Sequence, residues 1–250
     1  MIEDNKLNNN ISNVLQQLGN WLVVQQRLGI KSISPQQNIK KFMDIELVSG
    51  SKDQPSKPNS LMALRAQIES CDKCILCKKR TKTVFGEGPD NACLMLVGEA
   101  PGREEDLSGR PFIGISGQLL TRMLRAVGLN RSDVFITSIV KCRPPNNRTP
   151  RQEEIKACYP FLMTQIRYIR PNIILALGQS AAHCLLNTTE PLKKLRQTEH
   201  SMDGIKIFVT YHPAFLLRLS GKKQIEFKRK AWEDLQLMKK AYDQLCQNDQ

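Results

Sequence analysis

Short apolar runs alternate with helix-like stretches along most of this 250-residue chain. The apolar runs predict four strands, over residues 94–97, 134–140, 173–177 and 205–210. Helical spacing and helix-end signals predict helices over residues 117–127, 150–170, 179–186 and 224–246. Because strand and helix alternate, we expect an α/β protein, a three-layer α/β/α sandwich with a mainly parallel four-stranded sheet.

The second predicted helix has the clearest start signal. Thr149 is the expected N-cap, Pro150 occupies the first helical position, and Gln152 follows three residues after the cap. Pro160 predicts a kink within this helix, because a proline removes one backbone hydrogen bond.

Polar loops follow three of the predicted strands. They comprise residues 98–102, 138–145 and 211–214. The carboxyl ends of parallel strands meet at one edge of a sheet, where open α/β folds bind their ligands. We therefore expect these three loops to converge on one site.

Residues 1–59 differ in composition from the rest of the chain. Residues 11–28 have a loose helical pattern between Asn- and Gln-rich flanks, and residues 50–58 have the Ser, Lys and Pro content of a linker. We expect a helical or flexible extension with a linker over residues 1–59. Residues 60–250, in a chain with 40% hydrophobic residues, are enough for one α/β domain.

The charge balance indicates a polyanionic partner. The 37 Lys and Arg residues exceed the 24 Asp and Glu residues, giving a formal net charge of +13. Charge alone also fits an electropositive surface with no specific partner. The chain start lacks a signal-peptide pattern, and no apolar stretch approaches the roughly 20 residues of a membrane helix. We expect a cytoplasmic monomer that makes no membrane contact.

Four cysteines form two distant pairs, Cys71 with Cys74 and Cys142 with Cys158. Thiols stay reduced in the cytosol, so clustered cysteines there indicate metal ligands before disulfides. Cys77 extends the first pair, but the chain lacks the fourth Cys followed by Pro that a ferredoxin pattern requires. The remaining cysteines are interpreted as incidental thiols: Cys93, Cys184 and Cys246.

Several motifs occur in a fixed order within residues 60–245. They are Gly-Glu-Ala-Pro-Gly at 98–102, Gly-Arg-Pro-Phe-Ile-Gly at 109–114, Lys-Cys-Arg-Pro-Pro at 141–145, Asn-Arg-Thr-Pro at 147–150 and His-Pro-Ala-Phe-Leu-Leu-Arg at 212–218. Together they resemble the motifs of the family 4 uracil-DNA glycosylases. The resemblance implies a DNA repair enzyme that hydrolyses the N-glycosidic bond of uracil in DNA and leaves an abasic site.

The resemblance also implies a cofactor. Family cysteines at the positions of Cys71, Cys74, Cys142 and Cys158 bind a 4Fe-4S cluster, which agrees with four-thiolate ligation. Zinc fits the same four thiolates and remains an alternative.

Site residues follow from the same motifs. His212 would stabilise the negative charge on O2 of departing uracil, and Glu99 is a candidate to orient the attacking water. Ala100 stands where family 1 enzymes have a catalytic Asp. Phe112 would stack on the flipped base, and Glu105 would exclude the methyl group of thymine. The expected uracil-binding residues are Gly98, Glu99, Ala100, Glu105, Phe112, Ser138 and His212.

Other motif residues are expected to contact DNA. Leu216 and Leu217 would fill the gap left by the flipped nucleotide, and Arg218 would contact a phosphate. Arg143 and Arg148 would join Lys78, Lys79, Arg80 and Lys82 in a positive rim beside the cysteines, so binding would weaken with salt.

Ser138 departs from the family, which has Asn at this position to pair with O4 and N3–H of uracil. A hydroxyl makes fewer hydrogen bonds than an amide. Two alternatives therefore stay open: a catalytically impaired iron-sulfur protein that binds DNA, and a glycosylase with altered base preference. A zinc-containing nucleotide-processing enzyme is a third.

Overall fold

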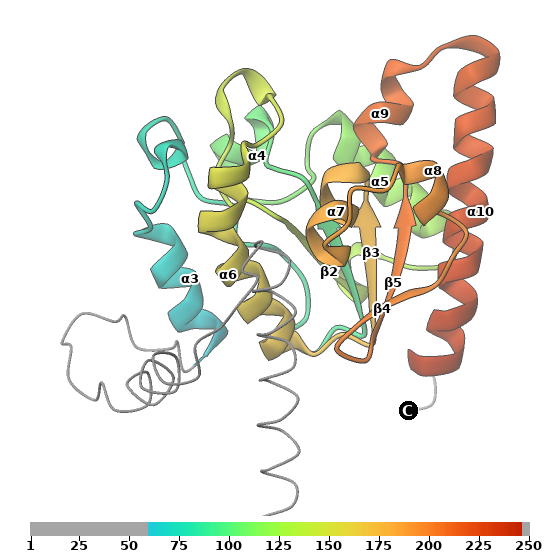
Figure 1. Ribbon diagram of the computed structural model, residues 1–250, viewed down its shortest axis with the longest axis horizontal. Helices are drawn as coiled ribbons and strands as arrows, with labels where there is room; N and C mark the ends of the chain where they lie inside the picture. The colour runs from blue at the N-terminus through green and yellow to red at the C-terminus, as the bar shows by residue number, and fades with distance from the viewer. Residues whose placement is uncertain (1–59, 247–250) are drawn as a thin grey trace, which may run out of the picture. The chain divides into compact units, whose positions relative to one another are not determined.

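A five-stranded sheet forms the centre of the computed structural model, which describes residues 60–246 (Figure 1). The strand order is β2-β1-β3-β5-β4, and only the edge strand β4 runs antiparallel to its neighbour. The strands are β1 (Leu94–Gly98), β2 (Val134–Ser138), β3 (Ile173–Leu177), β4 (His200–Met202) and β5 (Ile205–Thr210). The α/β fold with a mainly parallel sheet is confirmed, but the predicted count of four strands is wrong. The three-residue β4 has no apolar run that could reveal it.

Helices cover both faces of this sheet (Figure 1). The first half of the domain contains α3 (Leu61–Glu69), α4 (Arg103–Ser108), α5 (Ile115–Ala126) and α6 (Gln152–Ile169). The second half contains α7 (Gln179–Leu186), α8 (Leu192–Leu195), α9 (Pro213–Arg218) and α10 (Gly221–Cys246). Short 3-10 turns span Ile75–Lys78, Arg131–Asp133 and Pro145–Asn147.

Two hydrophobic clusters bind these helices to opposite faces. Because side chains alternate along a strand, Met95 and Val97 face one cluster, while Leu94 and Leu96 face the other. The first cluster contains apolar residues of α3, α6 and α7, and the second contains those of α5 and α10. All residues of β1, β2 and β3 are buried, which explains the continuous apolar runs of β1 and β3 and of the first three residues of β2.

The start of α6 differs from the prediction. The helix begins at Gln152, and its N-cap is Arg151 rather than Thr149. The Glu154 carboxylate accepts the Arg151 N–H at 2.7 Å, so a side chain inside the helix satisfies this donor. The helix also continues through Pro160, and it ends at Ile169, one residue before the predicted end.

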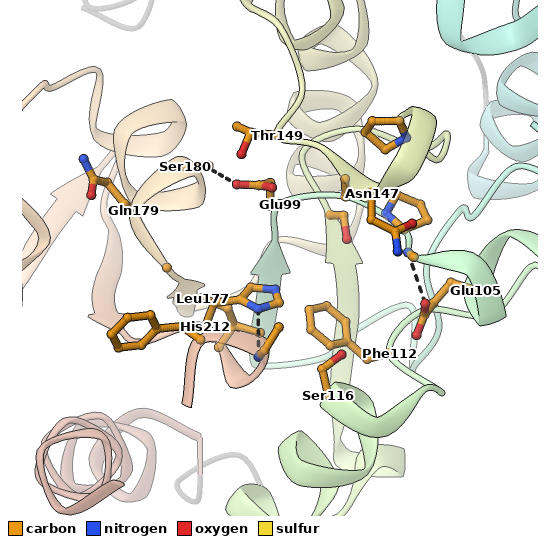
Figure 2. A pocket seen from close by; sticks show the side chains of 18 of the residues that line it. Glu99, Glu105, Phe112, Ser116, Asn147, Thr149, Leu177, Gln179, Ser180 and His212 are labelled. Carbon is orange, nitrogen blue, oxygen red and sulfur yellow. Dashed lines mark hydrogen bonds between the residues drawn. The ribbon is translucent and has the colours of Figure 1, made fainter. Parts of the chain in front are cut away.

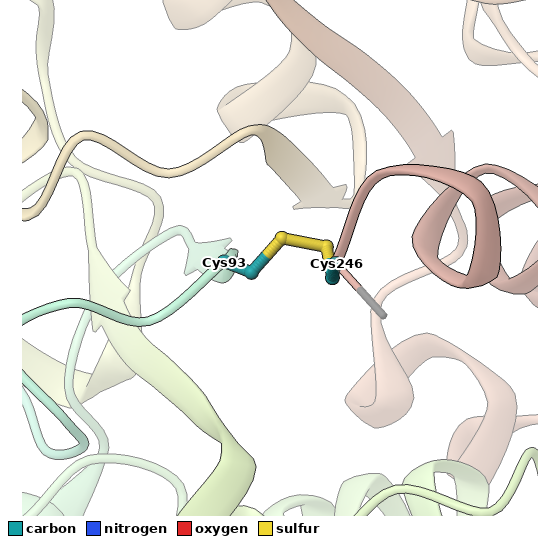
Figure 3. Close-up of a disulfide and its surroundings, with 2 residues drawn as sticks. All are labelled: Cys93 and Cys246. Atoms are coloured by element: carbon teal, nitrogen blue, oxygen red, sulfur yellow. A yellow bond between two sulfur atoms is a disulfide. The ribbon is translucent and has the colours of Figure 1, made fainter. Parts of the chain in front are cut away.

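A disulfide joins Cys93, directly before β1, to Cys246 at the end of α10 (Figure 3). The interpretation of these two residues as incidental thiols is therefore wrong. They are 153 residues apart in sequence, so their proximity depends on how α10 packs against the sheet. Cys184 remains a free thiol.

The expected extension over residues 1–59 lies outside the described residues. Within residues 60–246, no helix has both the length and the apolar character needed to cross a membrane. Among the described residues the first helix is α3, which begins after Ser60; the Ser60 hydroxyl accepts the Ala63 N–H at 3.1 Å and caps the helix.

Candidate active site

Loops after all four parallel strands line one cavity of about 680 Å³ (Figure 2). Glu99 follows β1, Ser138 ends β2, and His212 follows β5. The end of β3 and the turn into α7 also contribute, although the sequence did not indicate them. The lining residues there are Leu177, Gly178, Gln179 and Ser180. Convergence of the predicted loops at one edge of the sheet is confirmed.

The cavity brings together most of the residues expected to form the site. Those that line it are Glu99, Ala100, Glu105, Phe112, Ser138, Arg148, His212 and Arg218. Four expected residues do not line it: Gly98, Arg143, Leu216 and Leu217. Additional lining residues include Ser116, Asn147 and Thr149.

The backbone and the ring of Phe112 are both held in place by neighbouring residues. Its φ of 50° lies in the left-handed region, and Arg131 donates to the Phe112 carbonyl at 2.9 Å. A Cβ on Gly98 would lie 2.4 Å from the Phe112 ring, so only glycine lets the ring pack across the end of β1. Gly98 therefore supports Phe112 from outside the cavity lining.

Glu105 joins two loops of the cavity wall. Its carboxylate accepts the N–H groups of Ile113 and Gly114 at 2.9 Å each, and that of Gly102 at 3.1 Å. Since Glu105 is only 8% exposed, these three donors replace the water that an ionised carboxylate would otherwise bind. The Glu105 side chain thus fixes the turn that carries Phe112 relative to the loop after β1.

His212 lies 5.6 Å from Phe112, measured between ring centroids, and is the N-cap of α9 (Figure 2). Its Nδ1 accepts the Ala214 N–H at 3.1 Å, which requires an unprotonated Nδ1. Burial lowers the pKa of His212 to about 4, with the nearby Arg218 charge acting in the same direction and Glu105 opposing it. At neutral pH the imidazole is therefore uncharged and carries its proton on Nε2.

A sequence profile of the uracil DNA glycosylase superfamily matches residues 85–236, which hold all of these cavity residues. The chain belongs to the uracil DNA glycosylase superfamily. It is 46% identical to the type-4 uracil-DNA glycosylase of Pyrobaculum aerophilum over 63% of this chain and 85% of that protein. Identity to the type-4 uracil-DNA glycosylase of Archaeoglobus fulgidus is 43%, over 68% of this chain and 91% of the relative. The type-5 uracil-DNA glycosylase of Pyrobaculum aerophilum is more distant, at 34% identity over 56% of this chain and 69% of that protein.

In this superfamily member, Ser138 is placed by a buried lysine. Lys141 Nζ donates to the Ser138 carbonyl at 2.7 Å, to Thr137 Oγ1 at 2.7 Å and to Gln165 Oε1 at 2.6 Å. The Lys141 side chain is 1% exposed, so the three acceptors must compensate for its lost hydration. The main chain at the end of β2 is therefore fixed, although the Ser138 side chain is shorter than the Asn expected at this position from the family resemblance.

Cysteines surround a second, smaller cavity in the glycosylase domain. Its lining includes the four expected ligands and a fifth thiol, namely Cys71, Cys74, Cys77, Cys142 and Cys158. Arg80 donates to Cys142 Sγ at 3.3 Å, and the Lys141 N–H donates to Cys158 Sγ at 3.3 Å. Within residues 60–246, no three His, Cys, Asp or Glu side chains are arranged to hold a single metal ion.

The residues expected to contact DNA differ in their burial and in their partners within the protein. Leu216 is 1% exposed and packs in an apolar cluster with Tyr211, so it would have to leave this cluster to enter DNA. Of the two leucines expected to fill the gap left by the flipped nucleotide, the partly buried Leu217 is the better candidate. Arg80 donates to the carbonyls of Cys71 and Glu69 at 2.7 and 2.9 Å, which directs its guanidinium inward.

Arg143 and Arg148 also have partners within the protein. Arg148 forms two hydrogen bonds, of 2.8 and 2.6 Å, with the buried carboxylate of Glu154. This guanidinium lowers the pKa of the Glu154 carboxyl group. Arg143 donates to Asn147 Oδ1 at 2.7 Å. Both arginines thus hold the loop between β2 and α6 beside the cavity.

A buried ion pair supports the loop that carries His212. Arg196 donates to both carboxylate oxygens of Asp234, at 2.7 and 2.9 Å, and to the Tyr211 hydroxyl at 3.0 Å. Asp234 also accepts the Thr210 hydroxyl at 2.8 Å. Because Thr210 and Tyr211 directly precede His212, this network joins α8 and α10 to the loop that carries His212.

Removing the charge of Asp234 should destabilise the domain strongly. Asp234→Asn leaves the Arg196 guanidinium buried without its counter-ion, and loss of one partner of such a pair costs about 3–5 kcal/mol. We expect this decrease in the free energy of unfolding, measured by chemical denaturation. Asp243→Asn on the same helix is the matched control, because its pair with Lys239 is partly exposed and should contribute about 0.5 kcal/mol or less. Equal losses in both variants would contradict the role of the buried network.

Proposed function

We propose that this protein is a uracil-DNA glycosylase that releases uracil from DNA in base excision repair. Membership of the superfamily and 43–46% identity to type-4 uracil-DNA glycosylases support this function. The observation that carries it in the structure is the imidazole of His212 facing the same cavity as the Phe112 ring. His212 can contact the edge of a base while Phe112 contacts its plane.

The cavity residues suit a base that has left the DNA stack. Flipping costs a few kcal/mol, which contacts inside the pocket must offset. The Phe112 ring offers a stacking surface, and its fixed backbone lowers the entropy lost on binding. Ser138 is 4% exposed and lines the cavity at the end of β2, and we assign its hydroxyl to pair with the base edge.

His212 would stabilise the leaving group. As the bond between C1′ of the sugar and N1 of uracil breaks, its electron pair stays with the base, and negative charge develops on O2. A hydrogen bond from Nε2–H to O2 becomes stronger as this charge grows, so it lowers the barrier. Since the imidazole is neutral, it acts as a hydrogen-bond donor and does not need to transfer its proton.

Water completes the reaction at C1′. Ala100 has no group that can accept a proton, whereas the Glu99 carboxylate lines the cavity one residue earlier. We assign Glu99 to orient the water whose oxygen bonds to C1′ after the base departs. The water loses one proton and the departed uracil anion gains one, so the products are the abasic site and uracil.

The cysteine cavity supports a 4Fe-4S cluster on Cys71, Cys74, Cys142 and Cys158. The thiols of these four residues line one cavity although they come from three separate segments of the chain. Four thiolates are the ligand set of a 4Fe-4S cluster. When bound, the cluster would supply a cross-link between the segment after α3 and the segments around β2 and α6.

DNA contacts follow from the residues at the cavity mouth. Arg218 lines the cavity, and Leu217 follows on from the loop of His212. We assign Arg218 to a phosphate beside the flipped nucleotide and Leu217 to the vacated base position. Arg143 and Arg148 hold the facing loop, from which their remaining donors can reach the backbone of DNA.

Uracil excision by the purified protein tests the function. Anaerobically prepared protein should convert uracil-containing oligonucleotides, single-stranded or with U:G and U:A pairs, into abasic products revealed by alkaline cleavage. His212→Ala should lose at least about 100-fold in rate, as expected for loss of a donor that stabilises developing charge, while retaining DNA affinity. Protein with its full iron content that binds DNA but leaves uracil in place would favour the impaired-binder alternative.

Ser138 gives a second test, because the family Asn can make more hydrogen bonds to uracil. Ser138→Asn should lower KM by about 2- to 10-fold, which corresponds to one added hydrogen bond of about 0.5–1.5 kcal/mol. The measurement is steady-state excision of uracil, with a thymine-containing oligonucleotide as the specificity control. An unchanged or higher KM would mean that this position does not read the base.

A further inference from the structure

Ser180 is the one residue within 60–246 whose side chain hydrogen-bonds to the Glu99 carboxylate. Its hydroxyl donates to Glu99 Oε2, and both side chains line the cavity (Figure 2). We propose that Ser180 is a positioning residue that holds Glu99 in the orientation needed to place the attacking water. This inference rests on the proposed function of the same site.

The hydrogen bond between Ser180 and Glu99 links segments that follow two neighbouring strands of the sheet. Glu99 follows β1, and Ser180 is the second residue of α7, which begins directly after β3. The bond to Ser180 occupies one carboxylate oxygen and leaves Oε1 available to a water in the cavity. A long, flexible side chain is thereby restricted to few rotamers, which reduces the entropy lost when the water is bound.

Ser180 is itself held by a turn that contacts His212. The Gly178 N–H donates to the Thr210 carbonyl at 2.8 Å, and a Cβ on Gly178 would lie 2.9 Å from the Cβ of His212. The φ of Gly178 is 91°, which also favours glycine. One turn after β3 therefore sets both the imidazole and, through Ser180, the carboxylate. The positive end of the α7 dipole adds an attraction for the ionised Glu99 side chain.

A purely structural role for Ser180 would have different consequences. The N-cap of α7 is Gly178, so the Ser180 hydroxyl does not cap its own helix. If its bond to Glu99 served only to join β1 to α7, its removal would lower thermal stability and leave the rate per folded molecule unchanged. If it positions Glu99, removal should lower kcat with little change in KM, because uracil binding does not use this bond.

The experiment measures uracil excision by Ser180→Ala under steady-state and single-turnover conditions. We expect kcat to fall roughly tenfold or more, the usual effect of losing a hydrogen bond to a charged group, with KM within about twofold of wild type. Ser180→Thr retains a hydroxyl and should keep most of the rate. Ser201→Ala, an exposed serine on β4, is the matched control and should match wild type in rate and stability.

A double-mutant cycle with Glu99→Ala decides whether the two residues act together. Ser180→Ala should change the rate of Glu99→Ala protein by less than about twofold, because no carboxylate remains to be positioned. Losses that multiply, a wild-type rate in Ser180→Ala, or a loss that Ser180→Thr does not restore would overturn the proposal while leaving the glycosylase function intact. Absence of uracil excision in cluster-loaded wild-type protein would instead overturn the proposed function and this inference with it.

Discussion

The parallel register of β1, β2, β3 and β5 is the constraint on which the site depends. Gly98 pairs with Ser138, Val97 with Ala176, and Leu177 with Thr210, so the strands end at nearly the same level. Every residue after these ends therefore starts from one edge of the sheet. A shift of one residue in any strand would turn its buried side chains to the opposite face and move its loop out of the cavity.

Close backbone contacts turn this edge into a rigid pocket. Gly98 allows the Phe112 ring to cross the end of β1, and Gly178 allows the turn after β3 to touch His212. Glu105 then bonds the Phe112 turn to the loop after β1. These contacts fix the Phe112 ring and the His212 imidazole before any substrate arrives. In the proposed mechanism, such preorganisation would favour charge separation without a strong catalytic base.

The sequence predicted the parts of the fold that carry strong local signals. The bounds of β3, α7 and β5 follow from apolar runs and their punctuation. His212 and Phe112, which the family resemblance assigned to one site, line one cavity. The short edge strand β4 has no such signal. Thr149 resembled the N-cap of α6 because Pro150 and Gln152 fit the pattern of a helix start. The helix starts later, and the carboxylate of Glu154 accepts the N–H of the N-cap residue Arg151.

Contacts between distant segments account for what the sequence could not show. Ser180 has no recognisable motif, and its meeting with Glu99 depends on β1 and β3 lying side by side. Burial of Leu216 depends on packing against α10, and the Cys93–Cys246 disulfide likewise depends on the path of that helix. Such features are set by tertiary packing, which residue type and spacing do not encode locally.

The protonation state of His212 tests whether its neutral imidazole can act as the hydrogen-bond donor to departing uracil. The chain contains three histidines, so ¹⁵N-labelled imidazole signals can be assigned with one His→Gln variant for each. We expect a neutral His212 ring with its proton on Nε2 from pH 8 down to well below 6, and protonation only near the pKa of about 4. A ring that titrates near its ordinary pKa of about 6.5, or one that carries the proton on Nδ1, would contradict it.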